Sequence, residues 1–150
     1  MLFTKVIPLT LILTSTLVVS VAMAQNTTVI KERKNHFKTM SDAVKPTGAM
    51  LKGEAPFDLA IVKKAIRTIE EQAPKLANLF PEDSKEGEKT QALPDIWSNK
   101  AEFEGRFKKL ADAAKAAESS ITDEVTFQEV WPQVTGNCGG CHKKYRRKEE

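Results

Sequence analysis

The chain has 150 residues, 23 of them basic and 20 acidic, and a formal net charge of +3. This length suits one domain with a single core rather than two domains. The small charge excess gives no indication of nucleic-acid binding, because the basic cluster at residues 143–148 has the composition of a solvated helix C-terminus, where cations are favourable.

The first predicted element is a secretory signal peptide at residues 1–24. Lys5 precedes an uncharged run at residues 6–21, and Ala22-Met23-Ala24 has the small-x-small form of a cleavage site. An uncleaved membrane anchor is the alternative, but the run is short for a span of about 20 residues. Cleavage after Ala24 leaves one domain, residues 25–150, with no membrane segment. Loss of Lys5 lowers its formal net charge to about +2.

Four stretches of the remaining chain carry apolar residues at helical spacing, and no stretch alternates as a strand does. Such stripes are typical of helices that face a bundle core. The stripes comprise, in chain order, Ile30, Arg33, Phe37, Met40, Val44 and Leu51; Val62, Ile66, Ile69, Ala73 and Leu76; Phe103, Phe107, Leu110, Ala114 and Ala117; Phe127, Val130, Val134, Cys138, Cys141 and Tyr145.

The connections between these stripes predict their arrangement. The first lies between Pro46 and Pro56, and the third, at residues 119–123, offers Thr122 as a helix N-cap. The second, residues 81–99, is a long crossover whose Trp97 is expected to fold back on the helices. Since short connections join antiparallel neighbours, the predicted fold is all-α, an antiparallel up-down-up-down four-helix bundle.

The fourth helix is weak by its own composition. Pro132 is expected to kink it or delay its start. Gly136, Gly139 and Gly140 each cost a helix up to ~1 kcal/mol relative to alanine. We therefore expect another interaction to hold this segment in place.

Cys138-Gly139-Gly140-Cys141-His142 contains both cysteines of the chain and one of its two histidines. It matches the c-type haem attachment signature. On a helix, residues three apart share a face, so both sulfurs can bond to one haem edge. His142 projects about a quarter-turn further round and can reach the iron, and the glycines leave room for the flat ring.

Three other interpretations of this motif exist. A Cys138–Cys141 disulfide is possible in an oxidising compartment, but it leaves His142 unexplained. A thioredoxin-like redox motif needs neighbouring strands, which the sequence does not predict. A zinc site needs a further ligand, and the other histidine, His36, is about a hundred residues away.

The sequence resembles the cytochrome c′ family, the four-helix-bundle c-type cytochromes of the bacterial periplasm. The likeness covers nearly all of residues 25–150. It is carried by Ile30–Arg33 with Met40, Lys52–Asp58, Phe80-Pro81, Ala92–Trp97, and Cys138-x-x-Cys141-His142-x-x-Tyr145-Arg146.

The resemblance implies one covalently bound haem c per chain, with His142 as the proximal ligand of a five-coordinate iron. It also implies that Arg146 lies close to His142 and that Arg33 lies near the haem propionates. A periplasmic homodimer formed through the first two helices is implied as well.

Phe37 occupies the position from which low-spin relatives resembling cytochrome c556 ligate iron with methionine. A phenyl ring cannot ligate iron, so we expect Phe37 to form an apolar lid over the distal haem face. His36 should point to the flank or to solvent. Met40 shares the stripe and is expected to fill core space, whereas Met50 lies near the first connection and out of reach.

Four apolar residues of the first two helices have no obvious place in the core: Val29, Leu51, Leu59 and Ile61. Such a surplus predicts a partner surface, and the resemblance points to a two-fold homodimer. The alternative is that these residues cap the ends of the bundle.

These features favour a high-spin haem protein that binds nitric oxide and carbon monoxide, with a possible role in nitric oxide protection. The alternative is a low-potential electron-transfer cytochrome whose basic C-terminal end faces acidic redox partners. No acid–base pair is evident beside Phe37, so we do not expect an enzyme.

Overall fold

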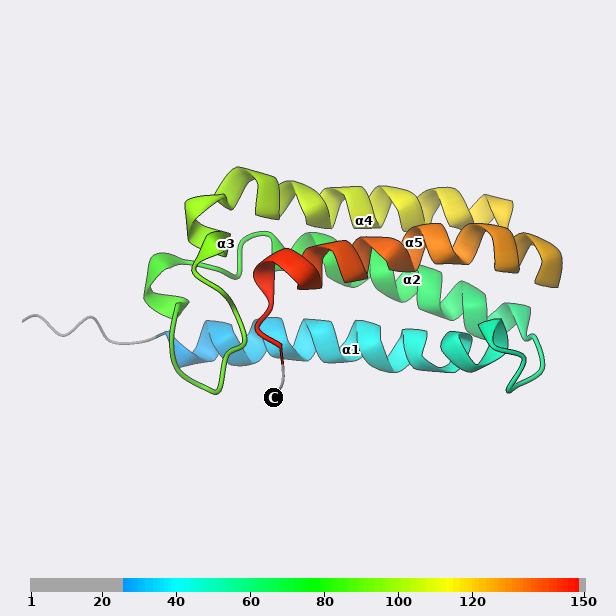
Figure 1. Cartoon of the computed structure of the whole chain (residues 1–150), viewed down its shortest axis with the longest axis horizontal. Helices are drawn as coiled ribbons and strands as arrows, with labels where there is room; N and C mark the ends of the chain where they lie inside the picture. Colours follow the sequence, from blue (N-terminus) through cyan, green and yellow to red (C-terminus); the bar gives the residue numbers. More distant parts are fainter. Residues whose placement is uncertain (1–25, 149–150) are drawn as a thin grey trace, which may run out of the picture.

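The computed structural model describes residues 26–148, so the predicted signal peptide lies outside the described residues. Within this range all regular elements are helical. The long helices are α1 (Thr27–Leu51), α2 (Leu59–Leu76), α4 (Lys100–Ser120) and α5 (Glu124–Tyr145), and the crossover contains the short helices η1 (Glu82–Ser84) and α3 (Asp95–Ser98). Figure 1 shows α1 and α4 running in one direction and α2 and α5 in the other. The predicted up-down-up-down bundle is confirmed.

The buried side chains follow the predicted stripes. Ile66 and Ile69 of α2 and Phe103 and Phe107 of α4 are at most 4% exposed. Each such side chain contributes about 1.5–3 kcal/mol relative to leaving it in water. The main packed pairs are α2 with α4, α1 with α2, and α4 with α5. The part of the chain from residue 26 to 148 has no helix that is both long and apolar enough to cross a membrane.

Two helices pass through prolines at which the sequence predicted a break or a kink. α1 continues through Pro46 to Leu51, and α5 begins at Glu124 with Pro132 inside it. A proline in a helix leaves the carbonyl four residues earlier without its usual donor. Those carbonyls belong to Asp42 and Gln128, which are both exposed. Water can satisfy them, so the first connection is shorter than predicted and Pro132 does not delay the start of α5.

The N-cap of α5 is Asp123, so the prediction of Thr122 was wrong by one residue. Oδ1 of Asp123 accepts a hydrogen bond from Thr126 N at 2.8 Å. Oγ1 of Thr126 in turn accepts from Asp123 N at 3.1 Å, which completes a reciprocal capping box. Threonine and aspartate both suit an N-cap position. Asp123 is distinguished only by Thr126, three residues later, which completes the capping box.

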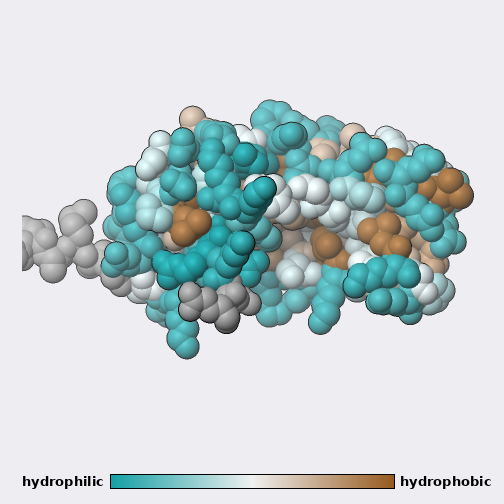
Figure 2. Space-filling model, viewed as in Figure 1, coloured by the Kyte–Doolittle hydropathy of each residue, from teal (hydrophilic) through white to brown (hydrophobic). Residues whose placement is uncertain are grey.

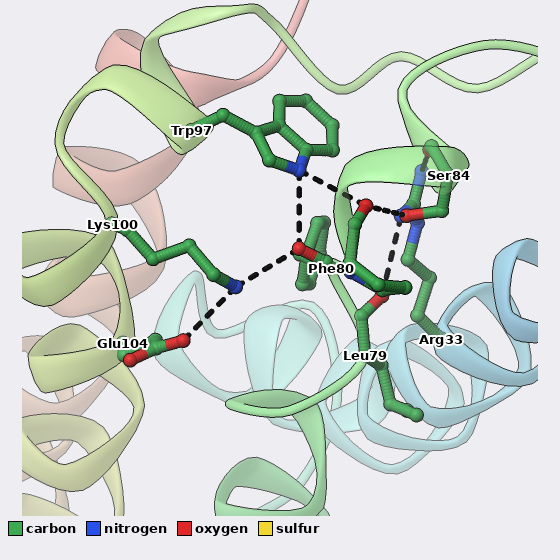
Figure 3. Close-up of polar contacts among 8 residues, drawn as sticks. Arg33, Leu79, Phe80, Ser84, Trp97, Lys100 and Glu104 are labelled. Atoms are coloured by element: carbon green, nitrogen blue, oxygen red, sulfur yellow. Dashed lines mark hydrogen bonds and ion pairs between the residues drawn. The ribbon is translucent and has the colours of Figure 1, made fainter.

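The crossover loop, residues 77–99, is fastened to the bundle. Trp97 does fold back on the helices, as predicted: it is half-buried and packs against the core. Within the loop, its Nε1 donates to the carbonyls of Phe80 and Pro81 at 3.1 Å each. Nζ of Lys100, at the start of α4, donates to the same Phe80 carbonyl at 2.9 Å (Figure 3). These bonds fix the loop over one end of the bundle.

The same loop also bonds to both ends of the described chain. Asn26 N donates to Asp83 O at 2.9 Å, just before α1 begins. At the other end, Leu93 N donates to Tyr145 O at 3.0 Å, and Arg147 N donates to Gln91 O at 2.8 Å. The start of α1 and the end of α5 are thus joined through one connecting segment.

Candidate functional site

A cavity of about 840 Å³ opens between α1, α4, α5 and the crossover loop. Its volume falls in the range of about 300–1,000 Å³ that is typical of small-molecule and cofactor sites. Figure 2 shows apolar and pale residues gathered along the middle of the face on which α1 and α5 lie. All the site residues predicted from the sequence line this cavity: Arg33, Phe37, Met40, Cys138, Cys141, His142 and Arg146.

The two thiols reach the cavity from one face of α5. Cys138 and Cys141 are unpaired and half-buried, and both stand in the cavity wall. Burial raises the pKa of both thiols, and the positive charge of Arg106 offsets part of that rise at Cys141. The spacing of three residues on a continuous helix therefore presents two sulfurs to the same space, as the motif predicted.

His142 follows Cys141 directly and also lines the cavity. Burial lowers the pKa of its imidazole below the ordinary value, and the charge of Arg146 lowers it further. A lowered pKa favours the neutral ring, which is the form that ligates metals. Arg146 is the C-cap of α5: its backbone N–H donates to His142 O at 3.1 Å, and its Nε donates to Gln91 Oε1 at 2.7 Å.

Three apolar side chains of α1 line the cavity among its basic residues. Phe37 is half-buried and lies against Phe107, with ring centroids 6.2 Å apart. Met40 is 8% exposed and belongs to the core, as expected. Val44 continues this wall one turn further along α1.

The two other candidate iron ligands considered from the sequence do not line the cavity. Nδ1 of His36 lies 2.6 Å from Gln72 Oε1 on α2, and its Nε2 lies 3.9 Å from Glu32. Met50 is buried in the core at the far end of α1. Both positions agree with the expectation that neither residue reaches the iron.

A cluster of aromatic rings closes the end of the cavity beneath the crossover loop. Phe103 packs edge-on against Phe80 at 4.6 Å and against Phe107 and Tyr145 at 5.0 Å each. Such edge-to-face pairs add about 0.5–1.5 kcal/mol to the burial of the rings. The sequence placed Phe103 and Phe107 on a core stripe but gave no sign that Phe80 would join them.

Arg33 is 2% exposed, which is unusual for a charged side chain. Burial lowers its pKa to about 10, so the guanidinium still carries its charge at neutral pH. Nη1 donates to Leu79 O at 3.2 Å and Ser84 Oγ at 2.8 Å, and Nη2 donates to Ser84 O at 2.9 Å (Figure 3). Nη2 also donates to Thr90 Oγ1 at 2.9 Å. The guanidinium also lies 4.4 Å from the Phe80 ring centroid. All four terminal N–H groups are engaged, so Arg33 fastens the crossover loop to α1. Its predicted place near the haem propionates stays a prediction.

We expect Arg33→Ala to lower the free energy of unfolding by about 3–5 kcal/mol, because the change leaves buried acceptors on the crossover loop without donors. Arg67→Ala is the matched control, since Arg67 is exposed and pairs with Glu118 at 3.0 Å on the surface. It should cost about 1 kcal/mol or less. Urea unfolding of the holoproteins measures both. Equal losses for the two variants would contradict the role assigned to Arg33.

The sequence did not single out Arg106, which lines the cavity from α4. Its Nη2 donates to Glu102 at 2.8 Å, and Glu102 also accepts from Lys144 of α5 at 2.8 Å. The hydrogen bond from Lys144, followed by that from Arg106, lowers the pKa of Glu102 to about 2. The three side chains join α4 to the thiol-bearing half of α5. In the sequence, Arg106 stands beside the stripe residue Phe107 but does not belong to the stripe. A basic residue at such a position is usually exposed to solvent.

The alternatives to haem attachment lack support in the described residues. Within residues 26–148, no group of three or more His, Cys, Asp or Glu side chains could hold a metal ion, so a zinc site lacks its further ligands. The same residues contain no strand to carry a thioredoxin-like motif. An added Cβ at Gly139 would meet nothing, and at Gly140 only Arg106 Nη1, 3.8 Å away. Protein packing alone therefore does not require these glycines.

The residues present fit a covalently bound haem. Two thiols three residues apart, a neutral imidazole beside them and an apolar cavity supply the attachment, the axial ligand and the space for the ring. A helical bundle with this site defines a c-type cytochrome. The family model described as "Cytochrome C'" matches residues 28–146, and the chain belongs to the cytochrome c′ family. Its cofactor is accordingly covalently bound haem c.

Relatives from one organism, Rhodopseudomonas palustris, illustrate this membership. A cytochrome c′ is 49% identical over 128 residues, which cover 85% of this chain and 87% of the relative. A cytochrome c-556 is 34% identical over 154 aligned positions, which cover 99% of each. The solved structure of a cytochrome c′ superimposes with a TM-score of 0.79 at 48% identity, covering 81% of this chain and 98% of that one.

Proposed function

We propose that the protein is a periplasmic haem protein with five-coordinate, high-spin iron that binds nitric oxide and carbon monoxide. Haem c supplies an iron centre that can bind a diatomic gas at an open axial position and can carry one electron. The observation that carries the proposal is that Phe37 lines the cavity and packs against Phe107. The resemblance to low-spin relatives implies that this position otherwise holds a ligating methionine.

The residues of the chain have separate roles in this proposal. Cys138 and Cys141 attach the haem, and the neutral imidazole of His142 holds the iron from α5. Phe37, backed by Phe107, excludes water and offers no hydrogen bond to a bound anion. Since nitric oxide binds ferrous haem without such a bond, an apolar wall favours it over water or anions. Protection against nitric oxide is the role that follows, and no catalytic residue is assigned.

Electron transfer is the second candidate function. The observation that favours it is the set of basic side chains around the mouth of the cavity, which suits approach by an acidic partner. A dedicated electron carrier usually keeps six-coordinate iron, so the spin state separates the two candidates.

Export with cleavage after Ala24 and formation of a homodimer through α1 and α2 belong to the same proposal. The apolar surplus that suggested the dimer is smaller than expected, however. Leu51, Leu59 and Ile61 are half-buried and pack against the core of their own chain. That arrangement favours their other predicted role, as caps of the bundle ends, and leaves Val29, which is also half-buried, as the remaining candidate for the interface.

The absorption spectrum of the ferrous holoprotein, with and without nitric oxide, tests this function. We expect a five-coordinate, high-spin spectrum, with His142 as the one protein ligand of the iron. Nitric oxide or carbon monoxide should change this spectrum without displacing a second protein ligand. A six-coordinate, low-spin ferrous spectrum would refute the gas-binding proposal and favour the electron carrier.

A further inference from the structure

One carboxylate, that of Glu102 on α4, holds two cations next to the cavity. Its Oε1 accepts a hydrogen bond from Arg106 Nη2 of the same helix at 2.8 Å. Its Oε2 accepts a hydrogen bond from Lys144 Nζ of α5 at 2.8 Å. Arg106 lines the cavity, and Lys144 follows His142 by two residues. Glu102 therefore contacts both a residue of the cavity wall and the end of the helix that carries the iron ligand.

The two cations lie close to the attachment turn, residues 138–142. The Arg106 guanidinium carbon lies 5.4 Å from the centroid of the Tyr145 ring, and Lys144 Nζ lies 5.2 Å from it. That ring is buried and lines the cavity. A Cβ added at Gly140 would lie 3.8 Å from Arg106 Nη1. The guanidinium is thus next to the backbone between the two cysteines.

Glu102 compensates only part of this charge. Within residues 26–148 it is the one carboxylate that forms an ion pair with Arg106 or with Lys144. One negative charge thus meets two positive charges. The carboxylate is ionised at neutral pH, because hydrogen bonds from Lys144 and Arg106 lower its pKa to about 2.

These ion pairs matter more to the cavity than to the stability of the bundle. All three side chains are partly exposed, and such pairs contribute little to the free energy of unfolding. Arg106 is half-buried in the cavity wall, however, so salt screens its charge less than that of a surface residue. The electrostatic effect of Glu102 should therefore appear at the haem iron.

We propose that Glu102 tunes the haem iron from outside the cavity: its carboxylate offsets the charge of Arg106 and Lys144 and so keeps the reduction potential of the iron low. Reduction adds one electron to the iron, and nearby cations favour that added charge. A carboxylate bonded to those cations weakens their effect. Groups beyond the ligands tune metal centres in this way. The inference needs the covalent haem but not gas binding, so the two can fail separately.

The test compares two single variants that each remove one carboxylate from α4. Glu102→Gln removes the charge from the cluster and preserves the shape of the side chain. Glu104→Gln is the matched control, because Glu104 is also partly exposed, pairs with Lys100 at 3.0 Å and does not line the cavity. A third variant, Glu102→Gln/Lys144→Gln, removes one charge of each sign. Spectroelectrochemical titration of each holoprotein at low ionic strength measures the midpoint potential, and urea unfolding reports whether the fold is retained.

We expect Glu102→Gln to raise the midpoint potential, and Glu104→Gln to raise it by about half as much or less. The double variant should return most of the way to the potential of the unmodified protein, because the net charge of the cluster is restored. The shift in Glu102→Gln should shrink at about 0.5 M salt, where the Debye length falls to a few ångströms.

Three results would overturn the proposal. The first is an unchanged potential in Glu102→Gln. The second is an equal rise in Glu102→Gln and Glu104→Gln, which would show that only the net charge of the chain matters. The third is a rise that persists in full in the double variant, because the uncompensated charge of Lys144 would then not be its cause. A low-spin, six-coordinate spectrum of the unmodified protein would refute gas binding and leave this test intact.

Discussion

The double variant Cys138→Ala/Cys141→Ala is expected to lose all of its haem on acid–acetone extraction, whereas the unmodified protein retains it. Both thiols face the cavity from one side of α5, and no other cysteine exists in the chain to replace them. Mass spectrometry of exported protein should give the mass of residues 25–150 plus one haem for the unmodified chain, and the polypeptide mass alone for the variant.

The single variants serve as controls. Cys138→Ala and Cys141→Ala each keep one thiol in the cavity wall and should hold the haem through one bond. Extractable haem in the unmodified protein, or haem that survives extraction from the double variant, would contradict the attachment. The double variant should also lose helicity near Gly139 and Gly140, because the covalent bonds no longer offset about 1 kcal/mol of helix propensity at each glycine.

Replacing Phe37 by methionine is expected to convert five-coordinate, high-spin iron into six-coordinate, low-spin iron. The change places a thioether at the position of Phe37 on α1, in the wall of the cavity that His142 also lines from α5. Nitric oxide and carbon monoxide would then have to displace the sulfur. Ferric and ferrous absorption spectra measure the spin state, and carbon monoxide should bind more slowly and more weakly.

Phe37→Ala should act in the opposite direction. It removes the ring from the cavity wall, so carbon monoxide should bind faster and more tightly than to the unmodified protein. Because Phe37 is only half-buried, the loss of stability should fall below the ~3–5 kcal/mol typical of a buried phenylalanine. Met40→Leu is the control and should leave the spin state unchanged. If Phe37→Ala kept normal carbon monoxide kinetics and Phe37→Met stayed high-spin, Phe37 would be excluded and Met40 would become the candidate.

The bundle could be predicted because its helices repeat one signal many times. Ile66, Ile69 and Leu76 all recur at helical spacing, and all are buried in the structure. A single unexpected residue, such as the polar Arg33 within the first stripe, does not alter such a pattern. The attachment motif could be predicted for a different reason: its chemistry is carried by neighbours in the sequence, so no tertiary information is needed.

The remaining features depend on contacts between distant residues. Arg33 is buried because Ser84 and Thr90, more than fifty residues away, accept its hydrogen bonds. Trp131 of α5 is fully buried, and its Nε1 donates to Thr47 at 2.8 Å. It fits the helical spacing between Phe127 and Val134, but the predicted stripe named the half-buried Val130 instead. The contacts of Arg33, in contrast, leave no periodic trace in the sequence.

The hydrogen bonds of the crossover loop also give the two sides of the cavity a mechanical connection. α1 packs chiefly on α2 and α5 chiefly on α4, so the helix of Phe37 and the helix of His142 have little direct contact. Between them runs a bonded path from Arg33 to Ser84 and along the loop to Leu93, which donates to Tyr145 O at 3.0 Å. The loop is therefore a strut: the Arg33 side chain, the loop backbone and the Leu93–Tyr145 hydrogen bond together link α1 to the last turn of α5, which ends beside His142.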